Sequence, residues 1–354
     1  MKAERDTKTG KWLIQYRYTD WQGERKKSTK RGFNTKREAE EWVRNFLMSQ
    51  QADFNMNFEE FVKLYYEDTA PRVRENTLRT KKYLIEQKIL PYFGKKAVNS
   101  IKPTDIRKWQ NEIMKQNFAP TYLRTINNQL SAIFNFAVTY YDLKSNPCQK
   151  AGTMGKKQAD EMNFWTKDEF SKFIESVMDK HRSYVGFKTL FWTGARIGEL
   201  LALNIEDINF EEKTLTISKS YQRIDKRDVI TPPKTPKSNR VLSIPDFLVD
   251  DLKDYVDSMY KPEPKDRLFP VTKHFFENEM KRGCKLSGVK KIRLHDTRHS
   301  HCALLFEMNI PILEIAERLG HERVETTLNI YAHIYPNKQQ QLSDKLNLVY
   351  GEEY

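Results

Sequence analysis

Residues 294–299 of the chain are Leu-His-Asp-Thr-Arg-His, and residues 319–321 are Leu-Gly-His. In the first stretch His295 and Arg298 are three positions apart, so a helix places both side chains on one face. The second stretch precedes Tyr331 by ten residues. Taken singly, a histidine beside a glycine is typical of a helix end, and a tyrosine in an apolar run is typical of a core. Their order along one segment makes them a candidate site.

Two stretches further upstream carry cations. The sequence TGARIGEL (193–200) places Arg196 behind a glycine-containing turn at the start of an apolar helix, with Glu199 three positions later. The sequence PPKTPKSNRVLSIP predicts a turn between two strands that bears Lys234 and Lys237. Arginines at helix starts and basic hairpin tips are common on protein surfaces, so neither stretch indicates a site by itself.

Length, charge and cysteine content narrow the class of protein. The chain has 354 residues, enough for two or three domains, and a formal charge of +13. This charge favours a polyanionic partner, nucleic acid above all. Cys148, Cys284 and Cys302 are widely spaced, which argues against a disulfide framework. Since no apolar run suits a membrane helix or a signal peptide, we expect a cytoplasmic protein with no membrane partner, associated with the nucleoid when bound to DNA.

The first 50 residues look like a small module. Alternating apolar and polar residues predict two or three short antiparallel strands, with a turn at residues 21–24. Thr35 and Glu38 form a capping box that begins a helix through about Met48. The module holds 13 Lys and Arg against 7 Asp and Glu, and a basic sheet face can enter a DNA major groove. The candidate contacts are Arg17, Lys26 and Lys27.

From Asn57 to about Asn146 the sequence is helical throughout. Apolar residues recur at spacings of three and four, and prolines separate the periodic segments, as expected for a compact bundle of four short helices. Basic residues on this bundle are candidates for phosphate contact, although lysines on a bundle surface are usually only solvated. These candidates are Arg72, Arg74, Arg79, Lys81 and Lys82.

A small, polar, aperiodic stretch follows the bundle and is the best linker candidate. Thr166 and Glu169 then form a second capping box that begins a larger, mostly helical domain. A strand region is predicted between about Lys213 and Ile244, in TLTISKS and VLSIP.

The ordered set of Arg, Lys, His-x-x-Arg, Leu-Gly-His and Tyr resembles the catalytic signature of the tyrosine recombinases, which include phage and transposon integrases. The resemblance covers about residues 160–340, and the two parts before it resemble the arm-binding and core-binding domains of such integrases. It implies a mainly α chain with small β elements in three domains. The domains are an arm-binding sheet plus helix (1–50), a core-binding bundle (55–148) and a mixed α/β catalytic domain (164–336), with a linker at 149–163 and a tail at 337–354.

The resemblance also implies roles for single residues. Arg196 and Arg298 would clamp the scissile phosphate of DNA, and Tyr331 would attack it and become a 3′-phosphotyrosine. Lys234, or Lys237 because the turn is long, would protonate the 5′ leaving oxygen. The remaining members of the set are two histidines that assist proton movement and one acidic residue that supports the site, namely His295, His321 and Glu199.

Elementary chemistry explains why these residue types are needed. The five-coordinate transition state of phosphoryl transfer carries about two negative charges, and guanidiniums stay charged while they bind phosphate oxygens in bidentate fashion. A 5′-alkoxide leaves poorly without a positioned acid, which contributes about 100- to 10,000-fold. A phenol, with a pKa of about 10, attacks well only after losing its proton.

Other classes of protein fit less of the sequence. A DNA-binding regulator without catalysis explains the basic modules, and a type IB topoisomerase shares the chemistry but needs no separate N-terminal module. No phosphate-binding loop or closely spaced carboxylate cluster occurs, so we expect no cofactor and no metal. The run HDTRHSHC lacks zinc-ligand spacing, and we interpret His299, His301 and Cys302 as packing or supporting residues.

The resemblance further implies double-stranded DNA with core and arm sites as the partner, and a homotetramer assembled on that DNA. A host DNA-bending protein and an excisionase are usual additional partners of such integrases. Leu342, Leu346 and Val349 have helical spacing in the tail, which suggests docking on a neighbouring subunit. Packing of the tail on its own domain fits the spacing equally well.

Overall fold

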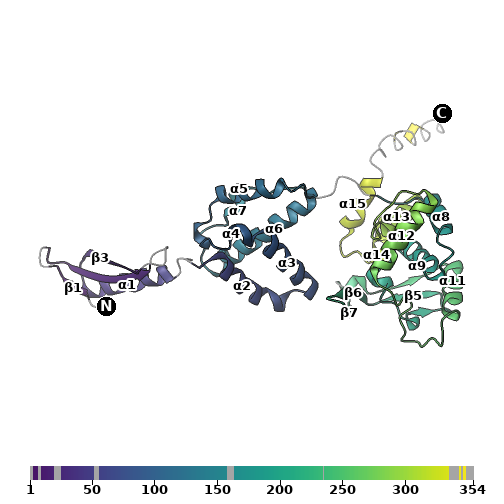
Figure 1. The fold of residues 1–354 in the computed structure, drawn as a ribbon, viewed down its shortest axis with the longest axis horizontal. Coiled ribbons are helices and arrows are strands. Elements are labelled where there is room, and N and C mark those ends of the chain that lie inside the picture. Colours follow the sequence, from purple (N-terminus) through teal and green to yellow (C-terminus); the bar gives the residue numbers. More distant parts are fainter. Residues whose placement is uncertain are drawn as a thin grey trace. The chain divides into compact units, whose positions relative to one another are not determined.

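The structure is a computed structural model in which the chain forms two compact units, Met1–Ala159 and Asp160–Tyr354 (Figure 1). The boundary between the units falls inside the predicted linker, and the three-domain boundaries stay a prediction. The predicted turn at 21–24, Lys234 and nearly all of the tail lie outside the described residues. The structure describes residues 3–6, 9–19, 25–51, 56–157, 163–233, 235–334, 343 and 346–347.

The N-terminal part of the first unit is an antiparallel sheet covered by one helix. Its elements are β1 (Ala3–Arg5), β2 (Trp12–Thr19), β3 (Arg25–Phe33) and α1 (Lys36–Gln51), with the strand order β1-β2-β3. Along β2, Ile14 and Tyr16 are buried under α1 while Arg17 is exposed, which is the alternation of a sheet with one covered face. The predicted cap of α1 is confirmed, since Oγ1 of Thr35 accepts the main-chain N–H of Glu38 over 3.1 Å.

The rest of the first unit is a helical bundle. Its elements are α2 (Phe58–Thr69), η1 (Ala70–Arg72), α3 (Glu75–Lys88), α4 (Leu90–Phe93), η2 (Val98–Ser100), α5 (Pro103–Met114), α6 (Pro120–Tyr140) and α7 (Pro147–Ala151). Prolines stand in the first turn of α4, α5, α6 and α7, where the missing N–H would have no helical partner. The core combines aliphatic side chains with aromatic ones, and the indole N–H of Trp109 donates to the main-chain oxygen of Lys88 over 2.8 Å.

The second unit is mainly helical with two small sheets, as predicted. Its helices are α8 (Lys167–Glu175), α9 (His181–Thr193), α10 (Ile197–Leu200), η3 (Ile205–Asp207), η4 (Pro236–Ser238), α11 (Asp246–Asp257), α12 (Lys273–Ser287), α13 (Asp296–Glu307), α14 (Ile312–Leu319) and α15 (Val324–Ile334). The sheets are β4 (Ile208–Asn209), β5 (Thr214–Ile217) and β8 (Arg240–Ser243) in the order β4-β5-β8, and the hairpin β6 (Ser220–Ile224) with β7 (Arg227–Thr231).

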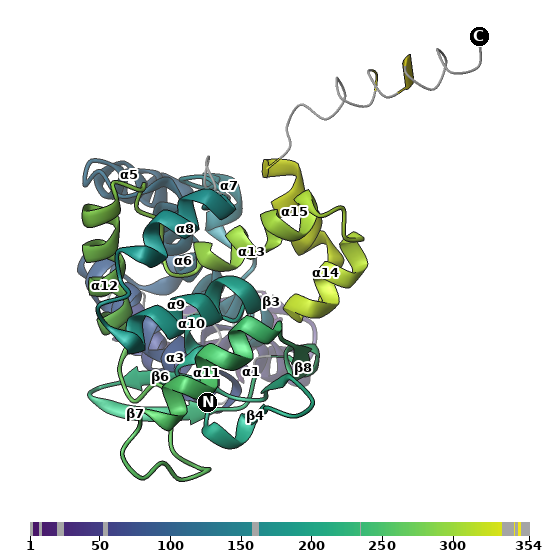
Figure 2. The same ribbon diagram turned by 90° about the vertical axis from the view of Figure 1, so that its right-hand side faces the viewer.

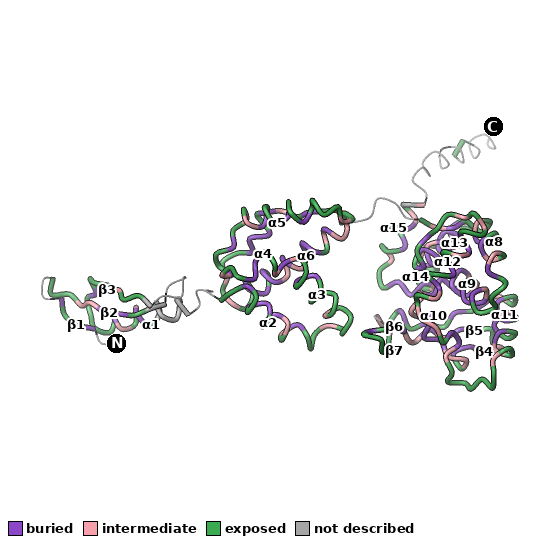
Figure 3. Tube along the Cα trace, viewed as in Figure 1, coloured by how far each residue is buried: buried purple, intermediate pink, exposed green. Residues whose placement is uncertain are grey.

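The helices α9 and α13 are the most deeply buried helices described in the second unit, and other elements pack around them (Figure 3). The rings of Phe170 and Phe191 stack at 3.8 Å between α8 and α9, and Trp165 packs against Phe173 at 4.4 Å. The helices α14 and α15 lie together and contact α13 (Figure 2). The predicted capping box of α8 is confirmed by Thr166 and Glu169. Among the described residues, no helix combines the length and the apolar character that crossing a membrane requires.

Candidate active site

Arg196 and Glu199 lie at the start of α10, directly after the end of α9. Gly194 ends α9 in the left-handed backbone conformation (φ 65°), which glycine adopts without strain. The carboxylate of Glu199 caps α10 by accepting the main-chain N–H of Arg196 over 3.0 Å, and it also accepts Nη1 of Arg196 over 2.7 Å. The side chain of Arg196 is 35% exposed and that of Glu199 only 5%. The turn therefore buries the acid and leaves the guanidinium accessible.

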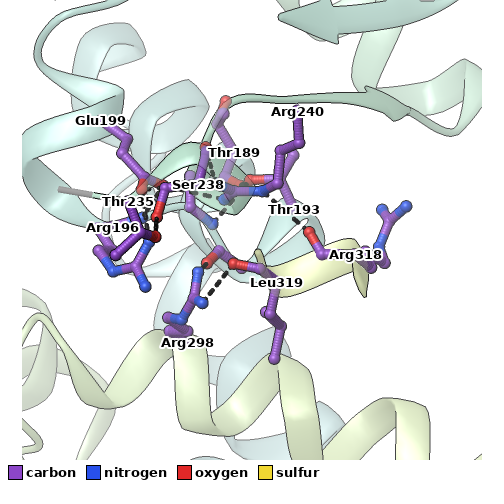
Figure 4. A network of polar contacts seen from close by, with 12 residues as sticks. Thr189, Thr193, Arg196, Glu199, Thr235, Ser238, Arg240, Arg298, Arg318 and Leu319 are labelled. Atoms are coloured by element: carbon purple, nitrogen blue, oxygen red, sulfur yellow. Dashed lines mark hydrogen bonds and ion pairs between the residues drawn. The ribbon is translucent and has the colours of Figure 1, made fainter. Parts of the chain in front are cut away.

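A second guanidinium, that of Arg240 on β8, binds the same carboxylate from inside the protein. Nη2 of Arg240 donates to Oε2 of Glu199 over 2.9 Å, and Nη1 lies 3.4 Å from Oε1 (Figure 4). Burial alone would raise the pKa of Glu199, but the guanidiniums of Arg240 and Arg196 outweigh burial and hold that pKa below its ordinary value. Glu199 is therefore an ionised carboxylate between two arginines.

Arg240 is the member of the site that the sequence reasoning missed. The signal was present, because β8 alternates buried Arg240 and Leu242 with exposed Val241 and Ser243. An arginine on the inward face of a strand requires buried acceptors, which makes it a candidate for a polar network.

Arg298 is almost wholly buried on α13 and joins the ends of α9 and α14. Its Nη1 donates to the main-chain oxygen of Gly194 over 2.8 Å, and its Nη2 donates to that of Leu319. Burial lowers the pKa of Arg298 to about 9, and the like charge of Arg196 adds to the effect. The guanidinium remains protonated at neutral pH, so this part of the site keeps a concentrated positive charge.

Gly320 and His321 follow the end of α14 and face the turn that carries Lys237. Gly320 has a φ of 64°, and a Cβ there would lie 2.8 Å from the main-chain oxygen of Lys237. Nδ1 of His321 shares a hydrogen bond of 2.8 Å with Oγ1 of Thr327. Burial, and then the charges of Arg298 and other cations, lower the pKa of His321 to about 3, so its imidazole is neutral. Glycine thus permits the close approach of two predicted site segments.

The other histidines of α13 differ in position. His295 precedes the helix at an exposed position, while its imidazole lies near enough to the interior and to Arg298 that desolvation, followed by the charge of Arg298, lowers its pKa. The ring of His299 meets that of His295 edge to face at 5.1 Å, and burial lowers the pKa of His299 to about 4. His301 is fully buried and accepts a hydrogen bond from Nε of Arg318 over 3.2 Å. Only His295 therefore combines the predicted position with access to a ligand.

Tyr331 lies on α15 and is half-buried. Its ring meets that of Phe306 edge to face at 4.9 Å, in an apolar cluster that also contains Leu319. Leu319 therefore connects Tyr331 to Arg298, because its side chain packs in the tyrosine's cluster and its main-chain oxygen accepts from the guanidinium. Lys237 is exposed in η4, whereas Lys234 is outside the described residues.

The structure separates the DNA-contact candidates of the N-terminal sheet. Arg17 pairs with Lys27 across β2 and β3, and both side chains are exposed on the face away from α1. Lys26 has the same strand parity as Lys30, whose Nζ lies over the ring of Trp42 on α1. Lys26 therefore lies on the α1 side of the sheet, and the three named residues do not share one face.

The candidates on the bundle are held to different degrees. Nη2 of Arg72 binds the carboxylate of Asp68 over 2.9 Å at the surface. Nζ of Lys81 on α3 donates to Oη of Tyr65 on α2 over 2.9 Å and to Oε1 of Gln129 on α6 over 3.1 Å, so this lysine links three helices of the bundle. The other members are exposed, namely Arg74, Arg79 and Lys82.

Three segments of the chain match families of known sequence. Residues 163–338 match the Phage integrase family, residues 57–114 match the N-terminal SAM-like domain of phage integrases, and residues 3–49 match an Arm DNA-binding domain. Together they span the N-terminal sheet, much of the bundle and the whole candidate site.

Individual proteins show the same similarity. The ICEBs1 integrase of Bacillus subtilis (strain 168) is 33% identical over 309 residues, which are 83% of this chain and 83% of that integrase. A tyrosine recombinase XerC-like protein of Caldanaerobacter subterraneus is 28% identical over 281 residues, 71% of this chain and 72% of that protein. The Tn1549 transposon integrase, solved with a circular intermediate DNA, has a TM-score of 0.66 at 20% identity and covers 80% of this chain and 99% of its own. The last likeness is one of fold.

Proposed function

The chain belongs to the phage integrase family, and we propose that this site-specific recombinase cleaves and rejoins DNA through a covalent 3′-phosphotyrosine at Tyr331. The observation that supports this chemistry best is one connected set of contacts. Arg196 binds the buried carboxylate of Glu199, and Arg298 bonds both Gly194, just before Arg196, and Leu319, just before the Gly320–His321 turn. A protein that only binds DNA has no need of such a buried arrangement.

The charge of the site suits a phosphodiester. The guanidiniums of Arg196, Arg240 and Arg298 and the carboxylate of Glu199 leave a net charge of +2 in one region. The transition state of phosphoryl transfer carries about two negative charges, so these groups stabilise it more than they stabilise the singly charged substrate. Arg196 is the accessible member and would bind the non-bridging oxygens, with Arg298 reinforcing it from the interior.

The proton balance of the cleavage step follows from the residue types. The phenol of Tyr331 releases its proton to solvent, assisted by the neighbouring imidazoles, as its oxygen forms a bond to phosphorus and the bond from phosphorus to the 5′ oxygen breaks. The departing oxygen takes a proton from Lys234 or, as the second candidate, from exposed Lys237. The reverse attack by a 5′ hydroxyl restores the phosphodiester and frees the tyrosine, so rejoining needs no external energy source.

The neutral histidines fit hydrogen bonding rather than charge. An imidazole with a pKa of about 3, as at His321, is neutral at pH 7, so it donates one hydrogen bond and accepts another. Its bond to Thr327 fixes the ring, so the remaining nitrogen can face the phosphate or the tyrosine. His295, exposed beside the start of α13, is the second imidazole for this task.

The N-terminal parts support recognition of double-stranded DNA. The exposed face with Arg17 and Lys27 would contact arm-type sites, and the bundle would contact core-type sites near the exchange point. Exchange between two duplexes involves four strands, which fits four subunits assembled on DNA. A host DNA-bending protein and an excisionase would set the direction of the reaction, and the element that moves is a phage or another mobile element.

Trapping on interrupted DNA tests the proposal. The protein is incubated with a duplex nicked next to the expected cleavage site, with a chelator present, and the products are separated under denaturing conditions. We expect a covalent protein–DNA adduct from the wild type and none from Tyr331→Phe, with DNA binding unchanged. An adduct formed by the Phe variant would refute the role of Tyr331, and no adduct from either protein would refute the covalent mechanism.

A further inference from the structure

Arg240 holds a central place in the site but lacks access to DNA. Its side chain is only 6% exposed, and its Nε donates to the main-chain oxygen of Arg318 over 2.9 Å. Nη1 donates to the main-chain oxygen of Ser238 over 3.0 Å, and Nη2 donates to Glu199 over 2.9 Å. All three nitrogens of the Arg240 guanidinium donate to protein acceptors, whereas Nε of Arg298 has no acceptor among the described residues. Arg240 is therefore the one of the two that is fully committed to the protein and has no nitrogen left to clamp a phosphate.

We infer that Arg240 is a positioning residue for strand cleavage that acts through Glu199, by balancing its charge so that Arg196 stays available to the scissile phosphate. The inference rests on the phosphate-binding role proposed for Arg196. It assigns to the buried arginine a task that neither of the two proposed clamp arginines performs.

Competition for Arg196 is the physical basis. Nη1 of Arg196 is 2.7 Å from Oε1 of Glu199, and the phosphate needs the same guanidinium. Arg240 binds the carboxylate through both oxygens, which removes part of the attraction that Glu199 exerts on Arg196. Without Arg240, the buried carboxylate would have Arg196 as its remaining partner in this network, and burial strengthens that pairing because water screens it little.

The same guanidinium also aligns two segments that the chemistry requires. Ser238 follows the turn that carries the lysine candidates, and Arg318 precedes Leu319, whose main-chain oxygen accepts from Arg298. The Cδ of Arg240 would lie 3.1 Å from a Cβ at Gly320, so the arginine packs directly under the Gly320–His321 turn. Loss of Arg240 would therefore affect charge and alignment together, and the experiment has to separate them.

Arg318 provides a matched control because it is a neighbouring arginine with different partners. Its guanidinium donates to Nε2 of His301, to the main-chain oxygen of Ser243 and to that of Trp192. Its contacts therefore join backbone segments of the same region, whereas those of Arg240 include the carboxylate of Glu199. Arg318→Met removes alignment without removing the partner of Glu199.

The test is a double-mutant cycle on adduct formation. Arg240→Met and Arg240→Lys are made in the wild-type chain and in the Glu199→Gln chain, alongside Arg318→Met in both. The rate of adduct formation on nicked duplex is measured in a single turnover with saturating protein, below the unfolding temperature of every variant. DNA affinity and thermal unfolding are measured for the same proteins.

We expect Arg240→Met to slow adduct formation about 100-fold in the wild-type chain and about tenfold or less in the E199Q chain, where no carboxylate competes for Arg196. Arg240→Lys keeps the positive charge but loses the bidentate geometry of a guanidinium, so its rate of adduct formation should lie between those of the wild type and Arg240→Met. DNA affinity should change little. Arg318→Met should slow the reaction by the same factor in both chains.

Equal effects of Arg240→Met in the two chains would overturn the inference, as would an effect no larger than that of Arg318→Met at equal loss of thermal stability. If Arg240→Met does not fold, Arg240→Lys compared in the two chains decides the question by the same criterion. Failure of the wild type to form any adduct would instead refute the covalent mechanism itself.

Discussion

Nη1 of Arg298 donates a hydrogen bond of 2.8 Å to the main-chain oxygen of Gly194, 104 positions earlier in the chain. Gly194 ends α9 two residues before Arg196, so this bond ties the helix of one proposed clamp arginine to the turn that carries the other. Arg298 is therefore a structural link as well as a charge, and the two arginines should respond differently to replacement.

Arg196→Ala and Arg298→Ala should both stop strand cleavage but should differ in stability. Removal of the Arg298 side chain leaves two buried carbonyl groups without their donor, which should lower the free energy of unfolding by about 1 to 3 kcal/mol for each group. Arg196 is half-exposed, and Glu199 still has Arg240 as a partner in the Arg196→Ala variant. We therefore expect this variant to lose about 1 to 2 kcal/mol in the free energy of unfolding.

Denaturant unfolding and adduct formation measure the two effects. DNA affinity should fall less than cleavage for both variants, because many other phosphate contacts hold the complex. Equal stability of the two variants would contradict the linking role of Arg298, and near-normal cleavage by either would contradict its place in the clamp.

Gly320→Ala should slow DNA cleavage as well as destabilise the fold, so its effect should exceed that of backbone strain alone. A Cβ at this position would lie 2.8 Å from the main-chain oxygen of Lys237, so the lysine turn has to move. Gly288→Ala is the matched control, since Gly288 also has a positive φ (72°) but nothing lies within 4 Å of the added Cβ. The control should lose only about 1 to 2 kcal/mol from the left-handed backbone and should cleave normally. If both alanine variants cleave equally well, the packing of Gly320 does not position the turn.

Acid should destabilise the second unit through its buried histidines. Burial lowers the pKa of His299 to about 4 and those of His301 and His321 to about 3, whereas an unfolded imidazole has a pKa of about 6.5. Between these values the unfolded chain binds more protons than the folded one, so stability is full above about pH 6.5 and falls as pH decreases. Each such histidine contributes up to about 1.4 kcal/mol per pH unit.

Thermal unfolding between pH 7 and pH 5 measures this slope, above the range in which most carboxylates titrate. His301→Gln keeps an acceptor for Arg318 and should flatten the slope by one proton. A slope that does not respond to His301→Gln would show that the buried imidazole takes no part.

Lys27→Ala and Lys26→Ala should differ in their effect on arm-site binding. Lys27 lies beside Arg17 on the exposed face of the N-terminal sheet, while Lys26 lies on the α1 side. If Lys27 contacts a phosphate, its loss should lower the slope of log affinity against log salt by about 0.9, and Lys26→Ala should leave that slope nearly unchanged. A larger effect of Lys26→Ala would mean that the other face of the sheet meets DNA.

Periodicity and capping residues predicted most of the fold. Thr35 and Thr166 cap their helices as expected, and prolines begin α5 and α6, because these are local interactions that neighbouring residues decide. The pairing of Arg17 with Lys27 on one face could not be predicted from the sequence, since it depends on the register between β2 and β3. A change of one residue in that register would exchange the faces on which Lys26 and Lys27 lie.

The site was predictable where its motifs are specific and not where it depends on tertiary contacts. Arg196, Arg298 and Gly320 belong to short motifs, and the structure brings them together. Arg240 escaped notice because its function depends on Glu199 and Arg318, which are 41 and 78 positions away. The alternation in SNRVLSIP places Arg240 on the same strand face as Leu242, but it does not identify the distant partner of the arginine.

The most direct test of the mechanism is to identify the amino acid that carries the DNA. The trapped adduct is digested with a protease and a nuclease, and the nucleotide-bearing peptide is sequenced by mass spectrometry. We expect a single nucleotide joined through its 3′ phosphate to Tyr331. Attachment to any other residue, such as Tyr335, would contradict the assignment of the nucleophile.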